Sequence, residues 1–364
     1  MTKTIALYIS SISKGGAERV IVNLAEYFYS RGYKVLLVTT RKEKEEYQIS
    51  EGIIRQISEP SSGEMTGGRI DNFRVRFCKL KDIWRKERPD VILSFIGKNN
   101  LMAILTSLGL KIPVVVSVRG EPTEEYYNRW MRLMAKGLFH FAAGVVLQTG
   151  RCYSFFPKAV RKKAVILKNP VHSNFFRERF EGEREKTVAA VGRIDENKNH
   201  ELLLRAFAGI AEEFPEYRLV IYGEGEKRKE LQELAGKLGM EERISLPGNV
   251  DNVAELIYKI SLFVLPSNTE GMPNTLIEAM LLGLPVIATD CPCGGPAELI
   301  THGVNGLLTP VGDAEKMKEA LRMVLGNCQR ADEMGREAAK LKMVYNAETV
   351  YKSWESYLVK VMQR

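Results

Sequence analysis

Short apolar runs alternate with longer amphipathic stretches along most of this 364-residue chain, and this alternation constrains the fold more than any other feature. In the first half, the runs are residues 5–9, 34–40, 91–96, 113–118 and 143–149. Runs that are apolar throughout are typical of parallel strands buried on both faces. Between the first two runs, Val20, Leu24 and Phe28 share one helical face, and Gly32 can end that helix. The pattern predicts a β-α-β unit.

The same alternation restarts near residue 186, with runs at 186–192, 218–223, 243–248, 262–267 and 284–290. Two successive series predict an α/β protein with two facing Rossmann-like, doubly wound domains and a cleft between them. We place the domains at residues 1–170 and 171–343, and we expect the amphipathic stretch 344–364 to pack back on the first domain. In such folds ligands bind where strands end and helices begin, so the loops at those points are candidate sites.

The motifs of several other functions are missing from the sequence. There is no GxxxxGK[ST] loop, no Asp-x-Asp pair, and no third glycine after Gly223 and Gly225, where Arg228 stands instead. The cysteines and histidines lack zinc-ligand spacing. We therefore expect no cofactor, no bound metal and a reduced, cytoplasmic compartment. The N-terminus predicts a strand and not a signal peptide, and no apolar run reaches the roughly 18 residues that span a membrane.

The charge is divided unevenly along the chain. Residues 1–170 contain 29 Lys and Arg against 15 Asp and Glu, a net charge of +14, whereas residues 171–364 have a net charge of −6. The basic half indicates an anionic partner, namely an anionic membrane surface, a phosphorylated substrate or nucleic acid; a solvated basic surface is the alternative. We expect no nucleic acid, because no recognition motif accompanies the charge.

Two stretches of the basic half, Arg69–Arg88 and Phe155–Lys163, interleave basic residues with aromatic ones. In the first, Phe73, Phe77 and Trp84 fall at helical spacing. Such stretches suit peripheral contact with an anionic leaflet or a lipid-diphosphate acceptor. The alternative is that the aromatic side chains belong to the core while the charges are solvated.

A glycine pair follows the first predicted strand. Residues 13–16 read Ser-Lys-Gly-Gly and precede the first predicted helix. Gly15 and Gly16 let a ligand approach the backbone closely, and the helix N-terminus behind them favours an anion. By itself, a Gly-Gly pair is equally typical of a plain turn.

Two cations bracket the loop that follows the first strand of the second series. Arg193 and Lys198 can clamp a diphosphate at this strand-to-helix turn. The alternative is a surface lysine and an arginine paired with Asp195 or Glu196. The residues of this loop alone do not decide between the two interpretations.

The most specific pattern is SNTEGMPNTLIEAM at residues 267–280. Gly271 permits a sharp turn, and Pro273 suits the first turn of a helix, whose first amides then point toward an anion. Glu270 and Glu278 are eight positions apart, so both can border one ligand. Carboxylates bind the hydroxyl groups of a sugar or a ribose strongly. A glutamate at the helix start and a second on the surface are the alternative.

Six segments together resemble a known family: GGAER at 15–19, GRIDENKN at 192–199, GEGE at 223–226, LPGNVDN at 246–252, PSNTEGMPNTLIEAMLLGLPVIATDCPCGGPAELI at 266–300, and GVNGLL at 303–308. The chain resembles retaining GT-B glycosyltransferases of family 4 over nearly its whole length. The Glu-x7-Glu pattern is highly specific when it occurs with the Gly-Arg…Lys loop. The family is metal-independent, which agrees with the missing Asp-x-Asp pair.

The resemblance implies roles for individual residues. Glu270 would hold hydroxyls of the donor sugar and Glu278 the ribose, while Arg193 and Lys198 would neutralise the leaving diphosphate. Gly15, Gly16 and the amides of Asn274, Thr275 and Leu276 would line the diphosphate, Gly271, Met272 and Pro273 would complete the donor loop, and Asn249 and Val250 would lie at the nucleobase.

One position departs from the pattern of the family. Many relatives carry a histidine near the reacting carbon, after the strand that corresponds to residues 113–118, whereas this chain has Arg119 there. Because of this departure, the resemblance does not define the chemistry on the acceptor side. Arg119 can hold an acceptor phosphate or the donor, or it can form a structural ion pair with Glu121 or Glu125.

The resemblance implies a retaining, metal-independent glycosyltransferase. The enzyme would move a hexose or N-acetylhexosamine from a nucleotide-sugar, with UDP-sugar expected ahead of GDP or ADP donors. The acceptor would be a lipid-linked glycan, including a polyprenyl-diphosphate-linked one, or a cell-surface glycan, at the inner face of the cytoplasmic membrane. The alternatives are an epimerase or phosphorylase on the same scaffold, and a non-catalytic subunit that binds a nucleotide-sugar.

Overall fold

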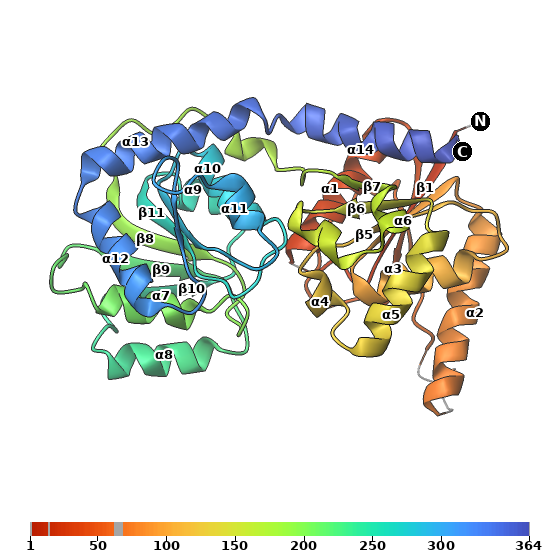
Figure 1. Cartoon of the computed structure of the whole chain (residues 1–364), viewed down its shortest axis with the longest axis horizontal. Helices are drawn as coiled ribbons and strands as arrows, with labels where there is room; N and C mark the ends of the chain where they lie inside the picture. The colour runs from red at the N-terminus through yellow and green to blue at the C-terminus, as the bar shows by residue number, and fades with distance from the viewer. Residues whose placement is uncertain (1, 14, 62–67, 364) are drawn as a thin grey trace. The chain divides into compact units, whose positions relative to one another are not determined.

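The computed structural model describes residues 2–13, 15–61 and 68–363, and these residues divide into two compact units. Unit 1 comprises Met1–Pro170 together with Ala347–Arg364, and unit 2 comprises Val171–Asn346. Each unit contains one parallel sheet with helices packed on it (Figure 1). The chain is therefore an α/β protein with two Rossmann-like domains.

The sheet of unit 1 has seven strands in the order β3-β2-β1-β4-β5-β6-β7. The strands are β1 (Thr4–Ile9), β2 (Lys34–Thr39), β3 (Ile54–Ile57), β4 (Val91–Phe95), β5 (Val114–Ser117), β6 (Gly144–Leu147) and β7 (Ala164–Ile166). All of them pair in parallel. The strand order reverses between β1 and β4, which is where the carboxyl ends of such sheets form ligand sites.

The helices of unit 1 cover both faces of this sheet. They are α1 (Gly16–Ser30), α2 (Arg69–Glu87), α3 (Gly97–Ser107), α4 (Pro122–Glu125), α5 (Arg129–Leu138), α6 (Lys158–Arg161) and α14 (Ala347–Met362), with 3-10 turns η1 (Phe139–Phe141) and η2 (Arg151–Phe155). Leu7 of β1 packs in one core cluster with Phe28 of α1 and Trp354 of α14. The neighbouring Tyr8 points to the opposite face, where its ring meets Trp84 of α2 at 6.1 Å. Successive strand residues thus fill two separate layers of core.

The sheet of unit 2 has six strands in the order β10-β9-β8-β11-β12-β13, again in parallel. The strands are β8 (Glu185–Val191), β9 (Arg218–Tyr222), β10 (Ile244–Gly248), β11 (Ile260–Leu265), β12 (Val286–Thr289) and β13 (Leu307–Thr309). The helices are α7 (His200–Ala208), α8 (Arg228–Lys237), α9 (Val253–Leu256), α10 (Asn274–Leu281), α11 (Gly295–Leu299), α12 (Ala314–Leu325) and α13 (Cys328–Ala339), with 3-10 turns η3 (Ser173–Phe175) and η4 (Lys340–Met343).

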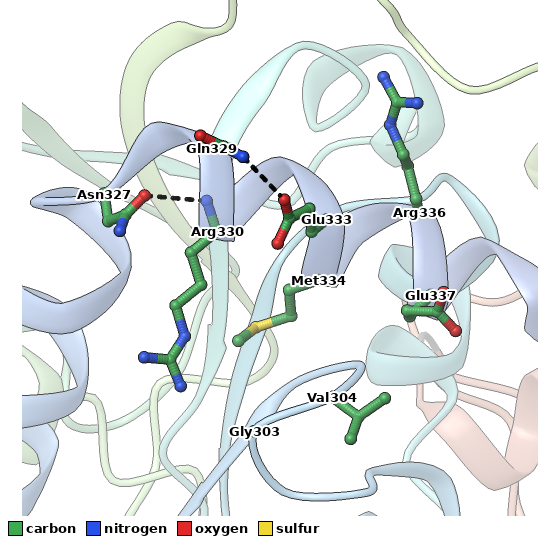
Figure 2. Close-up of a pocket in the computed structure, with 9 residues that line it drawn as sticks. All are labelled: Gly303, Val304, Asn327, Gln329, Arg330, Glu333, Met334, Arg336 and Glu337. Atoms are coloured by element: carbon green, nitrogen blue, oxygen red, sulfur yellow. Dashed lines mark hydrogen bonds between the residues drawn. The ribbon is translucent and has the colours of Figure 1, made fainter.

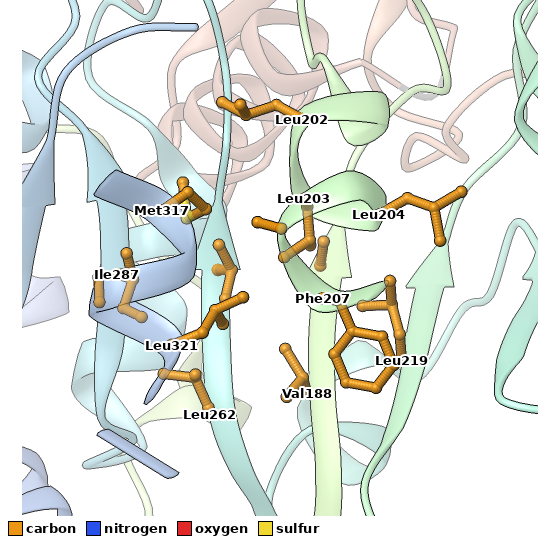
Figure 3. Close-up of a cluster of buried hydrophobic side chains, with 14 of the residues drawn as sticks. Val188, Leu202, Leu203, Leu204, Phe207, Leu219, Leu262, Ile287, Met317 and Leu321 are labelled. Atoms are coloured by element: carbon orange, nitrogen blue, oxygen red, sulfur yellow. The ribbon is translucent and has the colours of Figure 1, made fainter. Parts of the chain in front are cut away.

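Two apolar layers also sandwich the sheet of unit 2. On one face, Leu203 and Phe207 of α7 pack with Val188 of β8 and Leu321 of α12 (Figure 3). On the other face, Ala189 of β8 packs with Leu276 and Met280 of α10. Helices α7 and α10 follow strands β8 and β11, which are neighbours in the sheet. Their N-termini therefore start from adjacent strand ends, at the reversal of strand order.

The structure adds three strands that the apolar runs did not predict: β3, β7 and β13. β3 and β7 are edge strands whose side chains are largely half-buried or exposed, so they show no continuous apolar run. β13 is also an edge strand, and it is only three residues long. The last helix begins at Ala347 and not at residue 344, because η4 and three further residues precede it.

The apolar residues of α2 fit both interpretations in part: some belong to the core and others are exposed. Trp84 and Leu80 are buried in the core, whereas Phe73 is 50% exposed. In the second basic stretch, Phe156 is buried and Phe155 is partly so.

Among the described residues, no helix combines the length and the apolar character that a membrane crossing needs.

Candidate functional site

Two loops at the carboxyl edge of the unit 2 sheet meet side by side. Residues 192–199 connect β8 to α7, and residues 266–273 connect β11 to α10. Because β8 and β11 are hydrogen-bonded neighbours at the point where strand order reverses, these loops occupy the usual ligand position of a doubly wound sheet. They carry Arg193, Lys198 and Glu270, three residues that the sequence singled out.

Side-chain amides bind the two loops together. Asn197 Nδ2 donates to the carbonyl of Thr269 at 3.0 Å, and Asn197 Oδ1 accepts from the Thr269 amide at 3.0 Å and from its hydroxyl at 2.7 Å. Asn199 Nδ2 donates to Asn268 Oδ1 at 2.9 Å, and Asn268 Nδ2 donates to the Glu196 carbonyl at 2.8 Å. Sequence reasoning missed these asparagines, because a polar loop residue carries no sign of its partner 70 positions away.

Lys198 and Glu270 form the central contact of the site. Lys198 Nζ donates to Glu270 Oε1 at 2.5 Å, and the Ser267 hydroxyl donates to the same oxygen at 2.7 Å. The side chains of Lys198 and Glu270 are 19% and 12% exposed, so the pair is largely shielded from solvent but not fully buried. The aliphatic part of Lys198 runs over Gly192, where a Cβ would lie 3.2 Å from Lys198 Cε.

Arg193 lies at the surface of the same loop. Its guanidinium pairs with Asp195 Oδ2 at 3.0 Å, and its side chain is 70% exposed. Asp195 also accepts the Lys198 backbone amide through Oδ1 at 2.9 Å. The pairing with Asp195 is the one that the structural alternative named, but an exposed ion pair contributes little stability and can exchange with a ligand. Arg193 is therefore placed beside the site without being locked into it.

Helix α10 begins next to Glu270. The expectation that Pro273 lies in the first turn of the helix is wrong: Pro273 is the N-cap residue (φ −76°, ψ 108°) and precedes the helix. The first intrahelical bond runs from the Ile277 amide to the Pro273 carbonyl at 3.1 Å. The amides of residues 274–276 precede that bond, in the positions where helices bind anions.

Glycines bring neighbouring loops into backbone contact with the site. A Cβ on Gly295 would lie 1.6 Å from the Gly271 carbonyl oxygen, and a Cβ on Gly223 would lie 2.0 Å from the Gly192 carbonyl oxygen. Gly223 also has φ +149°, which side chains rarely adopt. The glycines of the GEGE and CGG segments therefore serve the close packing of the candidate site, which the sequence pattern did not reveal.

Glu278 lies inside α10 and is 2% exposed. The alternative of a surface glutamate is therefore wrong, because this position of the helix is buried. Asn249 and Val250 directly follow β10, and Gly248, the last residue of that strand, accepts a hydrogen bond from the Gly223 amide at 2.8 Å. The predicted donor residues of unit 2 thus lie along one edge of one sheet, at the ends of β8, β10 and β11.

His200, the first residue of α7, is a buried base that sequence reasoning did not select. Its side chain is 3% exposed, and it directly follows the loop that carries Lys198. Burial and the nearby charge of Lys198 lower the pKa of His200 to about 4. The imidazole is therefore neutral at physiological pH.

In unit 1, Gly15 is the N-cap of α1 and Gly16 is its first residue; Lys14 lies outside the described residues. The Gly15 amide donates to the Ser13 carbonyl at 2.7 Å, and the hydroxyls of Ser11 and Ser13 are 3.0 Å apart. This turn follows β1, next to the reversal of strand order in the unit 1 sheet. Its role toward a diphosphate stays a prediction.

Arg119 follows β5 and is held by neighbours across three strand ends. Its guanidinium donates to Asn169 Oδ1 at 2.7 Å and lies over the Phe95 ring at 4.6 Å. Of the two glutamates that are the alternative partners of Arg119 in a structural ion pair, Glu125 accepts a hydrogen bond from the backbone amide of Arg119. The side chain is thus oriented by an amide, an aromatic face and Ser117, whose Oγ lies 3.5 Å away.

A surface hollow of about 780 Å³ lies elsewhere on unit 2, between α13 and the turn at Gly303 and Val304 (Figure 2). Its size suits a ligand, but most of its lining is exposed, and two of its polar groups bind each other: Gln329 Nε2 donates to Glu333 Oε1 at 3.1 Å. None of the predicted residues lies there. Across the described residues, no three His, Cys, Asp or Glu side chains converge as a metal site.

Comparison with known families agrees with this arrangement. The model for glycosyl transferases group 1 matches residues 172–341, and the model for glycosyltransferase family 4 matches residues 14–170. Together they span both units. The chain belongs to the GT-B glycosyltransferases of the family 4 type, and it is a glycosyltransferase.

Similar proteins act in the synthesis of bacterial glycans. The chain is 26% identical to a Campylobacter jejuni α-1,4-N-acetyl-D-galactosaminyltransferase whose named substrate is a GalNAc-containing diNAcBac-PP-undecaprenol, over 98% of each chain. It is 25% identical to an amylovoran biosynthesis glycosyltransferase of Erwinia amylovora, over 98% of this chain and 100% of the relative. Anabaena HepE in complex with UDP has the same fold, with a TM-score of 0.80 at 19% identity over 99% of this chain and 100% of HepE.

Proposed function

We propose that the chain is a retaining, metal-independent transferase that moves a hexose or N-acetylhexosamine from a UDP-sugar to a lipid-linked or cell-surface glycan. The observation that carries the proposal is the joined pair of loops in unit 2, where Lys198, Glu270 and the start of α10 lie together at the reversal of strand order. This site offers cationic, carboxylate and amide groups, the three kinds of partner that a nucleotide-sugar requires.

The proposed roles follow the chemistry of each group. Lys198 and the first amides of α10 bind the diphosphate, joined by Arg193 when its exposed pair with Asp195 opens. Glu270 accepts hydroxyls of the donor sugar, and the buried Glu278 accepts those of the ribose. Because Glu270 already holds Lys198 at 2.5 Å, the donor must enter as a third partner of that pair.

The transfer breaks the bond between the anomeric carbon and the diphosphate oxygen and forms a bond from that carbon to the acceptor hydroxyl. The departing diphosphate oxygen takes the proton of the hydroxyl on the same face, so the configuration is retained. The protein then contributes positioning and the stabilisation of the negative charge that develops on the diphosphate. Lys198 and Arg193 supply that charge stabilisation.

The acceptor and the location form a finer part of the proposal. We propose a polyprenyl-diphosphate-linked or similar lipid-linked acceptor at the inner face of the cytoplasmic membrane. The net charge of +14 in residues 1–170 supports contact with an anionic surface. The Campylobacter relative, which is named for an undecaprenol-linked substrate, supports the acceptor class. The names of the relatives do not favour an epimerase, a phosphorylase or a binding subunit.

Calorimetry with UDP, GDP and ADP in the presence of EDTA tests the donor site. We expect one nucleotide to bind tightly to the wild type and to lose its affinity for Glu278→Ala. Glu319→Ala, an exposed glutamate paired with Lys316 on α12, is the matched control and should bind like the wild type. If no nucleotide binds, or if EDTA abolishes binding, the proposal of a metal-independent donor site is wrong.

A further inference from the structure

Helix α5 and the turn η1 that follows it expose several large apolar side chains. Trp130 is 77% exposed, Leu133 55%, Met134 43% and Phe141 66%. Residues 130, 133 and 134 share one helical face, while Met131 and Ala135 on the opposite face are buried. Tyr127, just before the helix, adds a further exposed ring at 60%. Contiguous exposed apolar surface of this kind marks an interaction site in a soluble protein.

The charges around this face are all of one sign over a long stretch. Residues 126–163 contain eight Lys and Arg and no Asp or Glu. Arg129 at the start of α5 is exposed, and so are Lys158 and Arg161 of α6, a helix that packs against η1. Lys98 of α3 lies over the Tyr127 ring at 5.4 Å. The acidic residues Glu121 and Glu124 precede this stretch, at the start of α4 and inside it.

Helix α2, the basic stretch that stood out in the sequence, has a different character. Its basic residues are interrupted by acidic ones, and Arg76 pairs with Glu59 at 2.5 Å. Its larger apolar residues near the C-terminal end, Leu80 and Trp84, are buried, whereas Ile70 and Phe73 near the other end are exposed. The exposed apolar face and the unopposed positive charge coincide on α5, not on α2.

We propose that the exposed face of α5 and η1, residues Tyr127, Trp130, Leu133, Met134 and Phe141, docks on an anionic lipid bilayer. The helix lies in the plane of the interface, with its aromatic and aliphatic side chains at the level of the headgroups and the surrounding cations on the anionic lipids. This inference rests on the proposed function, in which the acceptor is lipid-linked. Binding to the bilayer is nevertheless measured without any glycosyl transfer.

The tryptophans of the chain provide a direct probe. There are three, and Trp84 and Trp354 are fully buried, so Trp130 is the one that reports on solvent. On addition of vesicles containing phosphatidylglycerol, we expect a blue shift of Trp130 emission and protection from iodide. Vesicles of phosphatidylcholine alone should give a much smaller change. Sedimentation with the same vesicles measures binding.

Matched variants assign the binding to this face. Trp130→Ala should weaken binding by at least about tenfold, because the buried aromatic area is lost. Arg129→Glu should weaken it by about twenty-fold, because one cation near the surface contributes roughly fivefold and the variant reverses the charge. Phe73→Ala, an exposed ring on α2, is the control and should bind like the wild type. Vesicle binding that persists in Trp130→Ala, or a Trp130 blue shift without lipid that grows with protein concentration, would overturn the proposal in favour of another surface or of self-association.

A second inference rests on a different observation, the buried carboxylate of Glu125. It accepts the amides of Gly97 at 2.9 Å and Gly120 at 2.6 Å, and also that of Arg119. Gly97 follows β4, and the other two residues follow β5. One side chain at the end of α4 therefore fixes the backbone at the carboxyl ends of two central strands. Burial raises the pKa of Glu125, and the three backbone hydrogen bonds oppose that shift.

The backbone that Glu125 holds is in an unfavourable conformation. Ile96 has φ +72°, which is rare for a β-branched residue, and Gly97 has φ +23°. A Cβ on Gly97 would lie 2.8 Å from the Glu125 carbonyl oxygen. Conformations of this kind persist where surrounding contacts hold them, and they concentrate at functional sites.

We propose that Glu125 is a positioning residue for Arg119. By binding the Arg119 and Gly120 amides, it directs the guanidinium across the ends of β4 and β5, over Phe95 and toward Asn169. In the proposed function this places a fixed cation on the acceptor side. Glu125 touches no reactant in this account and acts through Arg119.

Glu125→Gln separates positioning from folding. The amide can accept at one oxygen only, so the variant should raise the acceptor KM or lower kcat by roughly 10–100-fold, because small displacements of a catalytic group are costly. The donor KM should not change. Glu121→Gln, four residues earlier, is the control. Spectra of protein labelled with 15N-glycine report on the Gly97 and Gly120 amides without any activity, and both peaks should move in Glu125→Gln. Unmoved peaks, or equal losses toward donor and acceptor, would refute the positioning role.

Discussion

The two units place a glutamate at the same edge of their sheets but use it in opposite ways. In unit 2, Glu270 holds the side chain of Lys198 and the hydroxyl of Ser267, and it stays partly exposed. In unit 1, Glu125 holds three backbone amides and its carboxylate is buried. A carboxylate bound to a side chain can exchange partners with a ligand, whereas one bound to backbone amides cannot move without moving the strand ends.

The same kind of sheet edge therefore serves a different function in each unit. The unit 2 edge is built from exchangeable ion pairs, which suits a charged donor that enters and leaves as a diphosphate. The unit 1 edge is built from fixed bonds and holds Arg119 in one orientation. We therefore expect substitutions of the ion-pair residues Arg193 and Lys198 in unit 2 to change chemistry with little cost in stability, and substitutions around Glu125 to change both.

The largest effect should follow Arg193→Ala. Arg193 is 70% exposed and its guanidinium pairs with Asp195 of the same loop, so the fold should not suffer. Loss of one charge-stabilising group at the diphosphate should lower kcat by roughly 10²–10³-fold. Steady-state kinetics with the identified donor measure this. A change under threefold would remove Arg193 from its assigned role and would leave Lys198 as the main cation.

The pH dependence of stability should differ in sign between the two regions. The pKa of His200 is lowered to about 4 from an unfolded value near 6.5, so its contribution is present above pH 6.5 and is lost as the pH falls toward 4. The loss amounts to about 3 kcal/mol if the whole shift is realised. Glu125 has a raised pKa, so its contribution is present at low pH and is lost as the pH rises above the usual range of a glutamate.

Urea unfolding between pH 4 and pH 7.5 measures these two contributions. His200→Gln should flatten the rise of unfolding free energy with pH, and Glu125→Gln should make that rise steeper. The two variants act in different units, so their effects should add. Identical pH profiles for His200→Gln and the wild type would show that the histidine is not held neutral by burial.

The sequence predicted the fold well where strands are buried on both faces. The central strands β1, β4, β8 and β11 appear as continuous apolar runs, because helices cover them on both sides. The edge strands β3, β7 and β13 were not predicted, because a half-covered or very short strand contains no such run.

The candidate site was predictable only in part. The motif residues Lys198 and Glu270 were identified by spacing, and the structure brings them to 2.5 Å. The residues that hold them were not, since the partners of Asn197 and Glu125 depend on which strand ends are neighbours. Strand order is a property of the assembled sheet and cannot be predicted from local sequence.

Asn197→Ala should show how much the bridge between the two donor loops contributes. Three hydrogen bonds to Thr269 are lost at once, and the Thr269 polar groups must find water instead. We expect a loss of about 1–3 kcal/mol in the free energy of unfolding and a fall in kcat of about tenfold as Lys198 and Glu270 lose their mutual position. Thermal unfolding and kinetics measure the two effects. Asn305→Ala, a loop asparagine that also bonds to backbone but lies outside the site, should cost stability without changing KM for the donor.

The smallest expected change in stability, that of Lys198→Met, tests the contrast between the two sheet edges most directly. Lys198→Met keeps the aliphatic packing over Gly192 and removes the charge that Glu270 holds. Because the pair is partly solvated and Ser267 still binds Glu270, the free energy of unfolding should change by no more than about 1 kcal/mol. Nucleotide binding should nevertheless weaken, because the diphosphate loses a cation. Differential scanning calorimetry with and without nucleotide separates the two. If the free protein instead unfolded many degrees earlier, the Lys198–Glu270 pair would be structural like the bonds of Glu125, and the contrast between an exchangeable and a fixed edge would fail.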